Sequence, residues 1–164
     1  MCGIAGIWSK NKLDTDRIES SLKLLCHRGP DDQKYKGFKT KNGMHIALLF
    51  TRLAIIDLDP RANQPMGYGG LWLTCNGEIY NYKEIKLVLL DLGHKFLGDS
   101  DTEVILHAFQ QWGISCIHKF IGMFAFVIYD TQKKEVFCVR DRTGIKPFFY
   151  YFNDGLFLFA SELK

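Results

Sequence analysis

The sequence predicts an α+β fold in four layers, with two antiparallel sheets lying between helices. Three observations support this class. The final third of the 164-residue chain is a series of apolar runs separated by short turn signals, which indicates antiparallel strands without intervening helices. Several of these runs are apolar on both faces, so a second sheet must cover one face and helices the other. Amphipathic helical patterns earlier in the chain supply those outer layers.

The first third of the chain is expected to hold a strand, a helix and a hairpin. The apolar stretch 3–8, with two interspersed glycines, predicts a strand that other groups can approach closely. A helix begins at Asp14 or Thr15, repeats apolar residues at i, i+4 and i+7, and ends before Gly29. An Asn-Gly pair at 42–43 is typical of a hairpin turn. The flanking strands are expected at 35–39 and 44–50, the second resuming through 53–56.

The middle third predicts a loop, a strand and two helices. Residues 58–70 contain two prolines and three glycines, which favours a loop, and the apolar run 71–76 favours a strand. Helices follow, because apolar side chains recur on one stripe and a glycine ends each pattern. These helices are expected at 78–92 and from a Ser100–Glu103 capping box to Gly113, with a short helical piece at 114–120.

The last third is expected to consist of strands alone. Turn signals, among them the Asn-Asp-Gly segment at 153–155, separate its apolar runs. The strands are expected at 123–129, 135–140, 148–152 and 156–160.

Charge and composition argue against several classes of protein. The net charge is +3 and no basic run exceeds Lys133-Lys134, so the chain lacks the basic surface of a nucleic-acid-binding protein. The aromatic run 148–152 has no interleaved Arg or Lys, which favours a buried strand over a base-stacking surface. No run of 18 apolar residues occurs and residues 1–13 lack an apolar core, so we expect neither a membrane span nor a signal peptide.

The cysteines argue against a disulfide framework and against a metal site. Their number is odd, their spacing is wide, and no C-x-x-C motif occurs. The histidines also lack the spacing of metal ligands. We therefore expect no metal in this domain and a reducing, cytoplasmic environment. The five cysteines are Cys2, Cys26, Cys75, Cys116 and Cys138.

Cys2 is the strongest candidate for chemistry. It follows Met1 directly and is small enough for the initiator to be removed, which would place a thiol and a free α-amine on one residue. An α-amine titrates near about 7.7–8.0, so it can take a proton from the thiol at neutral pH. Nucleophile and base on one residue are a known basis for covalent catalysis. The alternative is that Cys2 is a small apolar residue at the start of a strand, and if Met1 is retained the proposed base does not exist.

Seven segments together resemble the glutaminase domain of asparagine synthetase, one of the class II (N-terminal nucleophile) glutamine amidotransferases. The likeness covers residues 1–164 in order, and implies a single glutaminase domain with the αββα Ntn hydrolase fold. The sequence NGEIYN favours the asparagine synthetase branch over the sugar-phosphate and phosphoribosyl branches. The segments are CGIAG at 2–6, HRGPD at 27–31, RLAIID at 52–57, NGEIYN at 76–81, SDTE at 100–103, GMFAF at 122–126 and RDRTGIKP at 140–147.

The resemblance implies that Cys2 attacks the side-chain amide of glutamine, giving a γ-glutamyl thioester and ammonia. An oxyanion then develops and needs hydrogen-bond donors, which the Asn76 side chain and the Gly77 N–H offer. The alternative for Asn76-Gly77 is a two-residue hairpin turn. A helical pattern beginning at Glu78, rather than a returning strand, weighs against that turn.

The resemblance also implies a pocket for the α-carboxylate and α-ammonium of glutamine. Arg52 can make a bidentate fork with a carboxylate, and Asp101 and Glu78 would contact the ammonium. Leu53 and Ile55 complete the expected substrate-binding set. The alternatives are a solvated strand-end charge for Arg52 and a helix-capping role for Asp101.

One departure from the family pattern concerns the nucleophile's surroundings. Relatives commonly carry a His two positions before the arginine, where this chain has Phe50. This departure motivates a second hypothesis, a catalytically silent domain that binds glutamine or docks on a synthetase partner.

The resemblance implies a partner that this chain does not contain. Such a glutaminase domain feeds ammonia to an ATP-dependent synthetase domain, C-terminal or on a separate chain, and neither an S-G-G-x-D-S nor a P-loop motif occurs here. ATP and Mg²⁺ are therefore expected only with that domain, and no cofactor is expected in this one. A homodimer is compatible with the resemblance, and the ammonia acceptor is not encoded in these residues.

Overall fold

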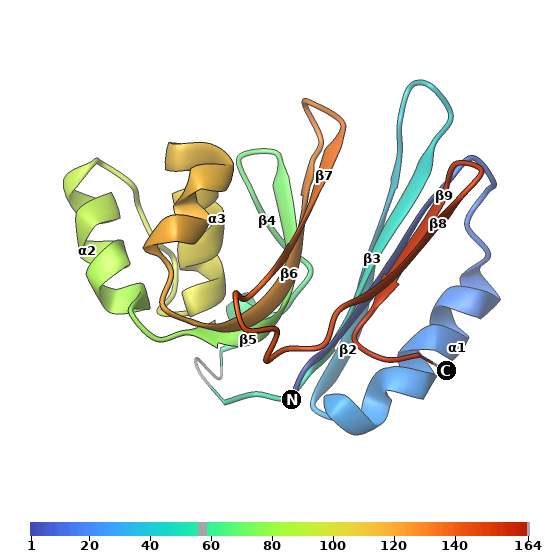
Figure 1. The fold of residues 1–164 in the computed structure, drawn as a ribbon, viewed down its shortest axis with the longest axis horizontal. Coiled ribbons are helices and arrows are strands. Elements are labelled where there is room, and N and C mark those ends of the chain that lie inside the picture. Colours follow the sequence, from blue (N-terminus) through green and yellow to red (C-terminus); the bar gives the residue numbers. More distant parts are fainter. Residues whose placement is uncertain (56–58, 164) are drawn as a thin grey trace.

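The four-layer αββα sandwich is confirmed by the computed structural model, which describes residues 1–55 and 59–163. Figure 1 shows helix α1 (Thr15–Leu25) on the outer face of one sheet and helices α2 (Tyr82–Asp91) and α3 (Asp101–Trp112) on the outer face of the other. Three short 3-10 helices occur at Cys26–Arg28, Pro60–Ala62 and Gly113–Lys119. Among the described residues, no helix is both long and apolar enough to span a bilayer.

Both sheets are antiparallel throughout. The larger has the order β2-β3-β1-β9-β8, with β1 at its centre, and we call it sheet A. The smaller has the order β4-β5-β6-β7 and is called sheet B. The strands are β1 (Gly3–Ser9), β2 (Asp32–Lys39), β3 (His45–Arg52), β4 (Met66–Tyr68), β5 (Leu71–Ile79), β6 (Gly122–Asp130), β7 (Glu135–Arg140), β8 (Phe149–Asn153) and β9 (Leu156–Ala160).

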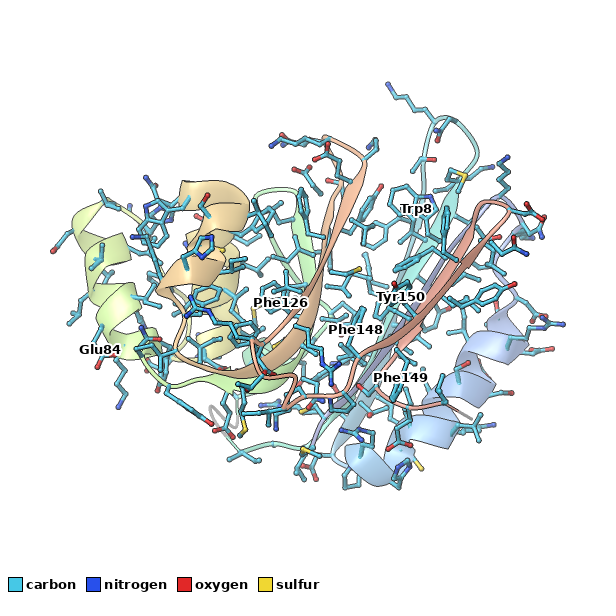
Figure 2. The ribbon with its side chains drawn as sticks, in the orientation of Figure 1. Trp8, Glu84, Phe126, Phe148, Phe149 and Tyr150 are labelled. Carbon is cyan, nitrogen blue, oxygen red and sulfur yellow. The ribbon has the colours of Figure 1, made fainter. Side chains whose placement is uncertain are left out.

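The core is divided by the two sheets into three apolar layers. One lies between the sheets, where Trp8 packs edge-on against Tyr129 with ring centroids 6.1 Å apart. A second joins sheet B to α2 and α3, and a third joins sheet A to α1. Figure 2 shows Phe126 between the helices and sheet B, whereas Glu84 lies on the solvent side of α2. Because every layer is apolar on both sides, β1, β3, β5 and β6 are the most deeply buried strands.

The helix expected at 78–92 begins later than predicted. Strand β5 continues through Glu78 and Ile79, which pair with Met123 and Gly122 of β6, and α2 starts only at Tyr82. The apolar stripe of this segment fits a helix, but pairing with a strand about 40 residues away, which local periodicity does not register, decides the backbone conformation.

Two predictions around the loop after β3 were also wrong. The strand was expected to resume at 53–56, but residues 53–55 are not in a strand, because the Leu53 N–H points to the Cys2 sulfur instead of to a neighbouring strand. Residue 56 lies outside the described residues, as does residue 58 at the start of the predicted loop. Within the rest of that loop, β4 forms by pairing with β5.

The aromatic run 148–152 is not a buried strand, contrary to expectation. It contributes β8, the outermost strand of sheet A, which pairs only with β9. No described strand covers its other edge, so all five residues of β8 are exposed.

Candidate active site

Cys2 is held at the start of β1 because side chains form hydrogen bonds with the backbone of Cys2 and of the next two residues. Arg28 donates from Nε to the Cys2 carbonyl at 3.0 Å. The Gly3 N–H donates to Thr51 Oγ1 at 3.1 Å, and the Ile4 N–H donates to Ser161 Oγ at 3.0 Å. These contacts fix the N-terminal segment, so the Cys2 side chain has a defined direction.

The Cys2 sulfur lies against the backbone of the residue that follows β3. The Leu53 N–H donates to Sγ at 3.4 Å, and the thiol donates to the Leu53 carbonyl at 3.6 Å. Burial raises the pKa of the Cys2 thiol, and Asp101 raises it further, whereas the Leu53 N–H, the N-terminal ammonium and Arg52 lower it. The thiol thus needs a base to become a nucleophile at neutral pH.

A cavity of about 80 Å³ opens beside Cys2 at the end of the sandwich where the N-terminus lies. All eight residues that the sequence and the resemblance singled out line it. They come from the start of β1, from the end of β3 and the loop beyond it, from β5 and from the start of α3. These residues are Cys2, Arg52, Leu53, Ile55, Asn76, Gly77, Glu78 and Asp101.

Asn76 occupies the middle of β5 and presents a buried donor without a partner. It pairs with Ala125 of β6, so Asn76-Gly77 is not a hairpin turn, and the helical argument used against that turn was wrong as well. The side chain is 1% exposed, and Nδ2 has no hydrogen-bond partner in the described structure. An unsatisfied buried donor costs about 1–3 kcal/mol, which a ligand oxygen in the cavity would relieve.

Gly77 brings β5 close to β6 and turns its N–H toward the cavity side of the strand. A Cβ at this position would lie 2.3 Å from the Met123 carbonyl oxygen, so only glycine fits without a backbone shift. Backbone groups of a strand alternate between its two edges. The Cys75 N–H donates to Gln64 at 2.6 Å and the Ile79 N–H to Asp101 at 3.0 Å, both away from β6. The Gly77 N–H lies between them on the same edge.

Arg52 is buried rather than solvated, which excludes the strand-end alternative. Its exposure is 7%, and Nη1 donates to the Asp59 carbonyl at 3.3 Å and to Asn63 Oδ1. These contacts hold the guanidinium in place on the cavity wall. A fixed guanidinium is suited to bind a carboxylate.

Asp101 begins α3 but does not cap it. Ser100 is the cap, since its Oγ accepts from the Glu103 N–H at 3.2 Å. The Asp101 carboxyl is turned to the cavity, and burial raises its pKa, as does nearby Glu78, while the N–H groups of Ile79 and Thr102 lower it. A carboxylate at this place can bind a cation, and the helix N-terminus offsets part of the cost of burying it.

Sequence reasoning missed Lys146, to which it assigned no role. Lys146 is 5% exposed and lines the same cavity, and Nζ donates to the Met1 sulfur at 3.3 Å. The only signal in the sequence was its place in the RDRTGIKP segment. Gln64 was also missed, and it joins the cavity wall by donating from Nε2 to Thr102 Oγ1 at 3.2 Å.

Phe50, which stands where relatives commonly carry a His, belongs to both the core and the cavity. It is almost fully buried in the layer between the sheets and forms part of the cavity lining.

Among the described residues, no group of three His, Cys, Asp or Glu side chains is arranged to hold a metal ion. The cavity itself brings a thiol together with an amide donor, carboxylates and cations around one small space.

Comparison with known proteins places the chain in a family. A family model described as a glutamine amidotransferase domain matches residues 1–164. The chain is 39% identical over 173 residues to the Bacillus subtilis asparagine synthetase (glutamine-hydrolyzing) 2, covering all of this chain and 22% of that relative. It is 38% identical over 171 residues to asparagine synthetase (glutamine-hydrolyzing) 3 of the same organism, covering all of this chain and 27% of the relative. The chain thus spans about a quarter of the length of these curated relatives.

A solved structure shows the same fold. It is the glutamine phosphoribosylpyrophosphate amidotransferase from Bacillus subtilis, in complex with ADP and GMP. The match has a TM-score of 0.74 at 23% identity and covers 98% of this chain and 42% of the other. The likeness identifies the four layers as the Ntn hydrolase fold.

Proposed function

Because this chain belongs to the glutamine amidotransferase domain family, we propose that residues 1–164 form a glutaminase domain that hydrolyses L-glutamine to glutamate and ammonia. One observation carries the proposal. The Cys2 sulfur and the unpartnered Asn76 amide line one cavity with Arg52 and Asp101. In this proposal Cys2 is the nucleophile, Asn76 is an oxyanion donor, and Arg52 and Asp101 are the charges that bind the substrate.

The proposed chemistry begins with loss of Met1, which frees the α-amine of Cys2. That amine takes the thiol proton, and the thiolate attacks the side-chain amide carbon of glutamine, so that a C–S bond forms and the carbonyl electrons move to oxygen. Asn76 Nδ2 and the Gly77 N–H would donate to this oxyanion. When the oxyanion collapses, the C–N bond breaks and ammonia leaves with the transferred proton. Water then hydrolyses the γ-glutamyl thioester to glutamate and restores the thiol.

Substrate selection would rest on the charges around the cavity. Arg52 would bind the α-carboxylate of glutamine as a bidentate fork, and Asp101 and Glu78 would bind the α-ammonium. Leu53 and Ile55, on the loop after β3, would cover the aliphatic part of the substrate. The Leu53 backbone would also keep its contacts with Sγ.

The ammonia would pass to an ATP-dependent partner domain of the asparagine synthetase type. The full coverage of this chain by relatives that bear that name supports this step, as does their much greater length. ATP and Mg²⁺ would belong to that partner. The competing hypothesis is a domain that binds glutamine without hydrolysing it.

The test is release of ammonia and glutamate from glutamine by protein whose loss of Met1 has been checked by intact mass. Cys2→Ala should lower turnover by at least about 10³-fold, because the nucleophile is removed. Hydroxylamine should trap γ-glutamyl hydroxamate with the unmodified protein and not with this variant. Cys138→Ala, which changes an exposed thiol outside the cavity, is the matched control and should leave the rate unchanged.

Glutamine binding by calorimetry without ammonia release would support the silent-domain hypothesis and overturn the proposed reaction. Turnover that persists in Cys2→Ala would show that another group is the nucleophile.

A further inference from the structure

Lys146 is a buried lysine that lines the cavity and has no acidic partner among the described residues. Its exposure is 5%, and none of the ion pairs in the described part of the chain includes it. Nζ donates to the Met1 thioether at 3.3 Å, which is a weak acceptor. Buried lysines are normally paired with an anion, so this placement requires an explanation.

The backbone around Lys146 is fixed, so the direction of its side chain is set by the fold. The Asp141 carboxylate accepts from the N–H groups of Ile145 at 2.9 Å and Lys146 at 3.0 Å. Arg140 donates from Nε to the Lys146 carbonyl at 2.7 Å. Burial would raise the pKa of Asp141, but these N–H groups lower it below its ordinary value, which keeps this anchor ionised.

The contact with Met1 places the Lys146 ammonium on the amino side of Cys2. Met1 is joined to Cys2 by a peptide bond, and Met1, Cys2 and Lys146 all line the same cavity, so removal of Met1 exposes the new α-amine to the space that Lys146 lines. The other charged groups near the Cys2 α-amine act on its protonation in opposite directions. Asp101 and Glu78 favour a protonated amine, while Arg52 opposes protonation. The charge of Arg28 is offset by its ion pair with Glu162 at 2.7 Å.

We propose that Lys146 is a positioning residue that keeps the Cys2 α-amine unprotonated, and hence able to accept the thiol proton, by placing a positive charge beside it. This inference rests on the proposed function. Two carboxylates at the cavity are needed for the substrate ammonium, yet they also stabilise the protonated amine. Lys146 offsets them on the amine side of the cavity, so that glutamine recognition and a neutral base coexist.

The experiment measures the pKa of the Cys2 amine directly and the rate of the reaction separately. Protein labelled with α-¹⁵N cysteine and freed of Met1 is titrated by NMR, and kcat/KM for glutamine is measured over the same pH range. In Lys146→Met the pKa of the Cys2 amine should rise by about one unit, and the acid limb of kcat/KM should move with it. At pH 7 the rate should fall about tenfold and recover at higher pH, with KM unchanged. Lys146→Arg should restore both values.

Lys133→Met removes an exposed lysine in the β6–β7 turn and should change neither titration nor rate. An unchanged amine pKa in Lys146→Met overturns the inference, and a pH-independent loss with raised KM assigns Lys146 to substrate binding instead. If Lys146→Met does not fold, the unmodified protein decides, since an amine pKa at or above the ordinary range of about 7.7–8.0 contradicts the inference. The NMR titration does not need turnover, so failure of the glutaminase proposal can be distinguished from failure of this one.

Discussion

Helix α3 joins two polar clusters that are built in opposite ways. At its first turn lies the Cys2 cavity. Two turns further along, the histidine cluster consists of His94, His107, Gln111, Tyr68 and Phe96. His107 is fully buried, its Nδ1 lies 2.9 Å from that of His94, and His94 Nε2 lies 2.9 Å from Gln111 Oε1. The rings of Tyr68 and Phe96 pack against it with centroids 3.9 and 4.2 Å away.

The difference between the clusters lies in what the polar groups face. In the histidine cluster, side chains bind each other and aromatic rings fill the remaining space. The buried side-chain nitrogen of this cluster without a hydrogen bond, His107 Nε2, lies 3.8 Å from Glu103 and is covered by protein atoms. In the Cys2 site, by contrast, the residues that carry the unsatisfied Asn76 Nδ2 and the unpaired Lys146 line an open cavity. Buried polar groups therefore indicate a binding site only where the fold also leaves a cavity for the ligand.

The largest expected effect tests the cavity side of this comparison. Asn76→Ala should lower kcat by about 10²–10³-fold, because one oxyanion donor is lost. Its stability to urea should hardly change, since Nδ2 has no partner to lose. Asn81→Ala is the matched control, because Asn81 donates to the Lys119 carbonyl and accepts from the Ile121 N–H, both at 2.9 Å. That variant should be less stable and equally active. The reverse pattern would contradict the assignment.

The next effect tests the histidine cluster. The pKa of His107 is lowered to about 4, chiefly by burial, with Glu103 raising it and His94 lowering it by smaller amounts. The unfolded chain binds a proton near pH 6.5 and the folded protein does not until about pH 4. The free energy of unfolding should therefore fall as the pH drops through this window, by about 2 kcal/mol at pH 5. Urea unfolding at pH 7 and pH 5 measures it, and His107→Gln should remove that part of the pH dependence. A stability that is equally sensitive to pH in both proteins would show that other groups dominate.

The smallest effect concerns the helix that the clusters share. Ser100→Ala should lower the free energy of unfolding by about 1 kcal/mol, because the Glu103 N–H loses its cap. Asp101 is also held by the Ile79 N–H, so kcat/KM should stay within about threefold of the original value. A loss of activity beyond tenfold would mean that the cap, and not the contact with β5, orients Asp101.

Local signals predicted the parts of the fold that are decided locally. The Asp14 cap of α1, the Ser100 cap of α3 and the turns of the last third appear where the sequence placed them. The errors lie where distant pairing overrides periodicity. Glu78 and Ile79 were assigned to a helix but are held in β5 by β6, and β8 is exposed because it ends its sheet.

The candidate site, like the fold, was predicted where the signal is local and missed where it depends on distant parts of the chain. Cys2, Asn76 and Asp101 stand in short motifs that can be recognised in the sequence, although the roles of these residues stay predictions. Lys146 also stands in a recognised segment, RDRTGIKP, but its place in the cavity could not be found in this way, because only the folded chain brings it to Met1, 145 positions away. The missing partner of Asn76 Nδ2 likewise depends on the surrounding atoms, not on the motif.

The open edge of β8 has a consequence for handling this domain in solution. Phe149, Tyr150, Tyr151 and Phe152 are all exposed, and the strand carries no charged residue, proline or bulge that would discourage another strand from pairing with it. Backbone pairing between two molecules at this edge would extend sheet A and shelter the aromatic rings. Self-association that grows with protein concentration is therefore expected of the isolated domain, and one added lysine in β8 would oppose it.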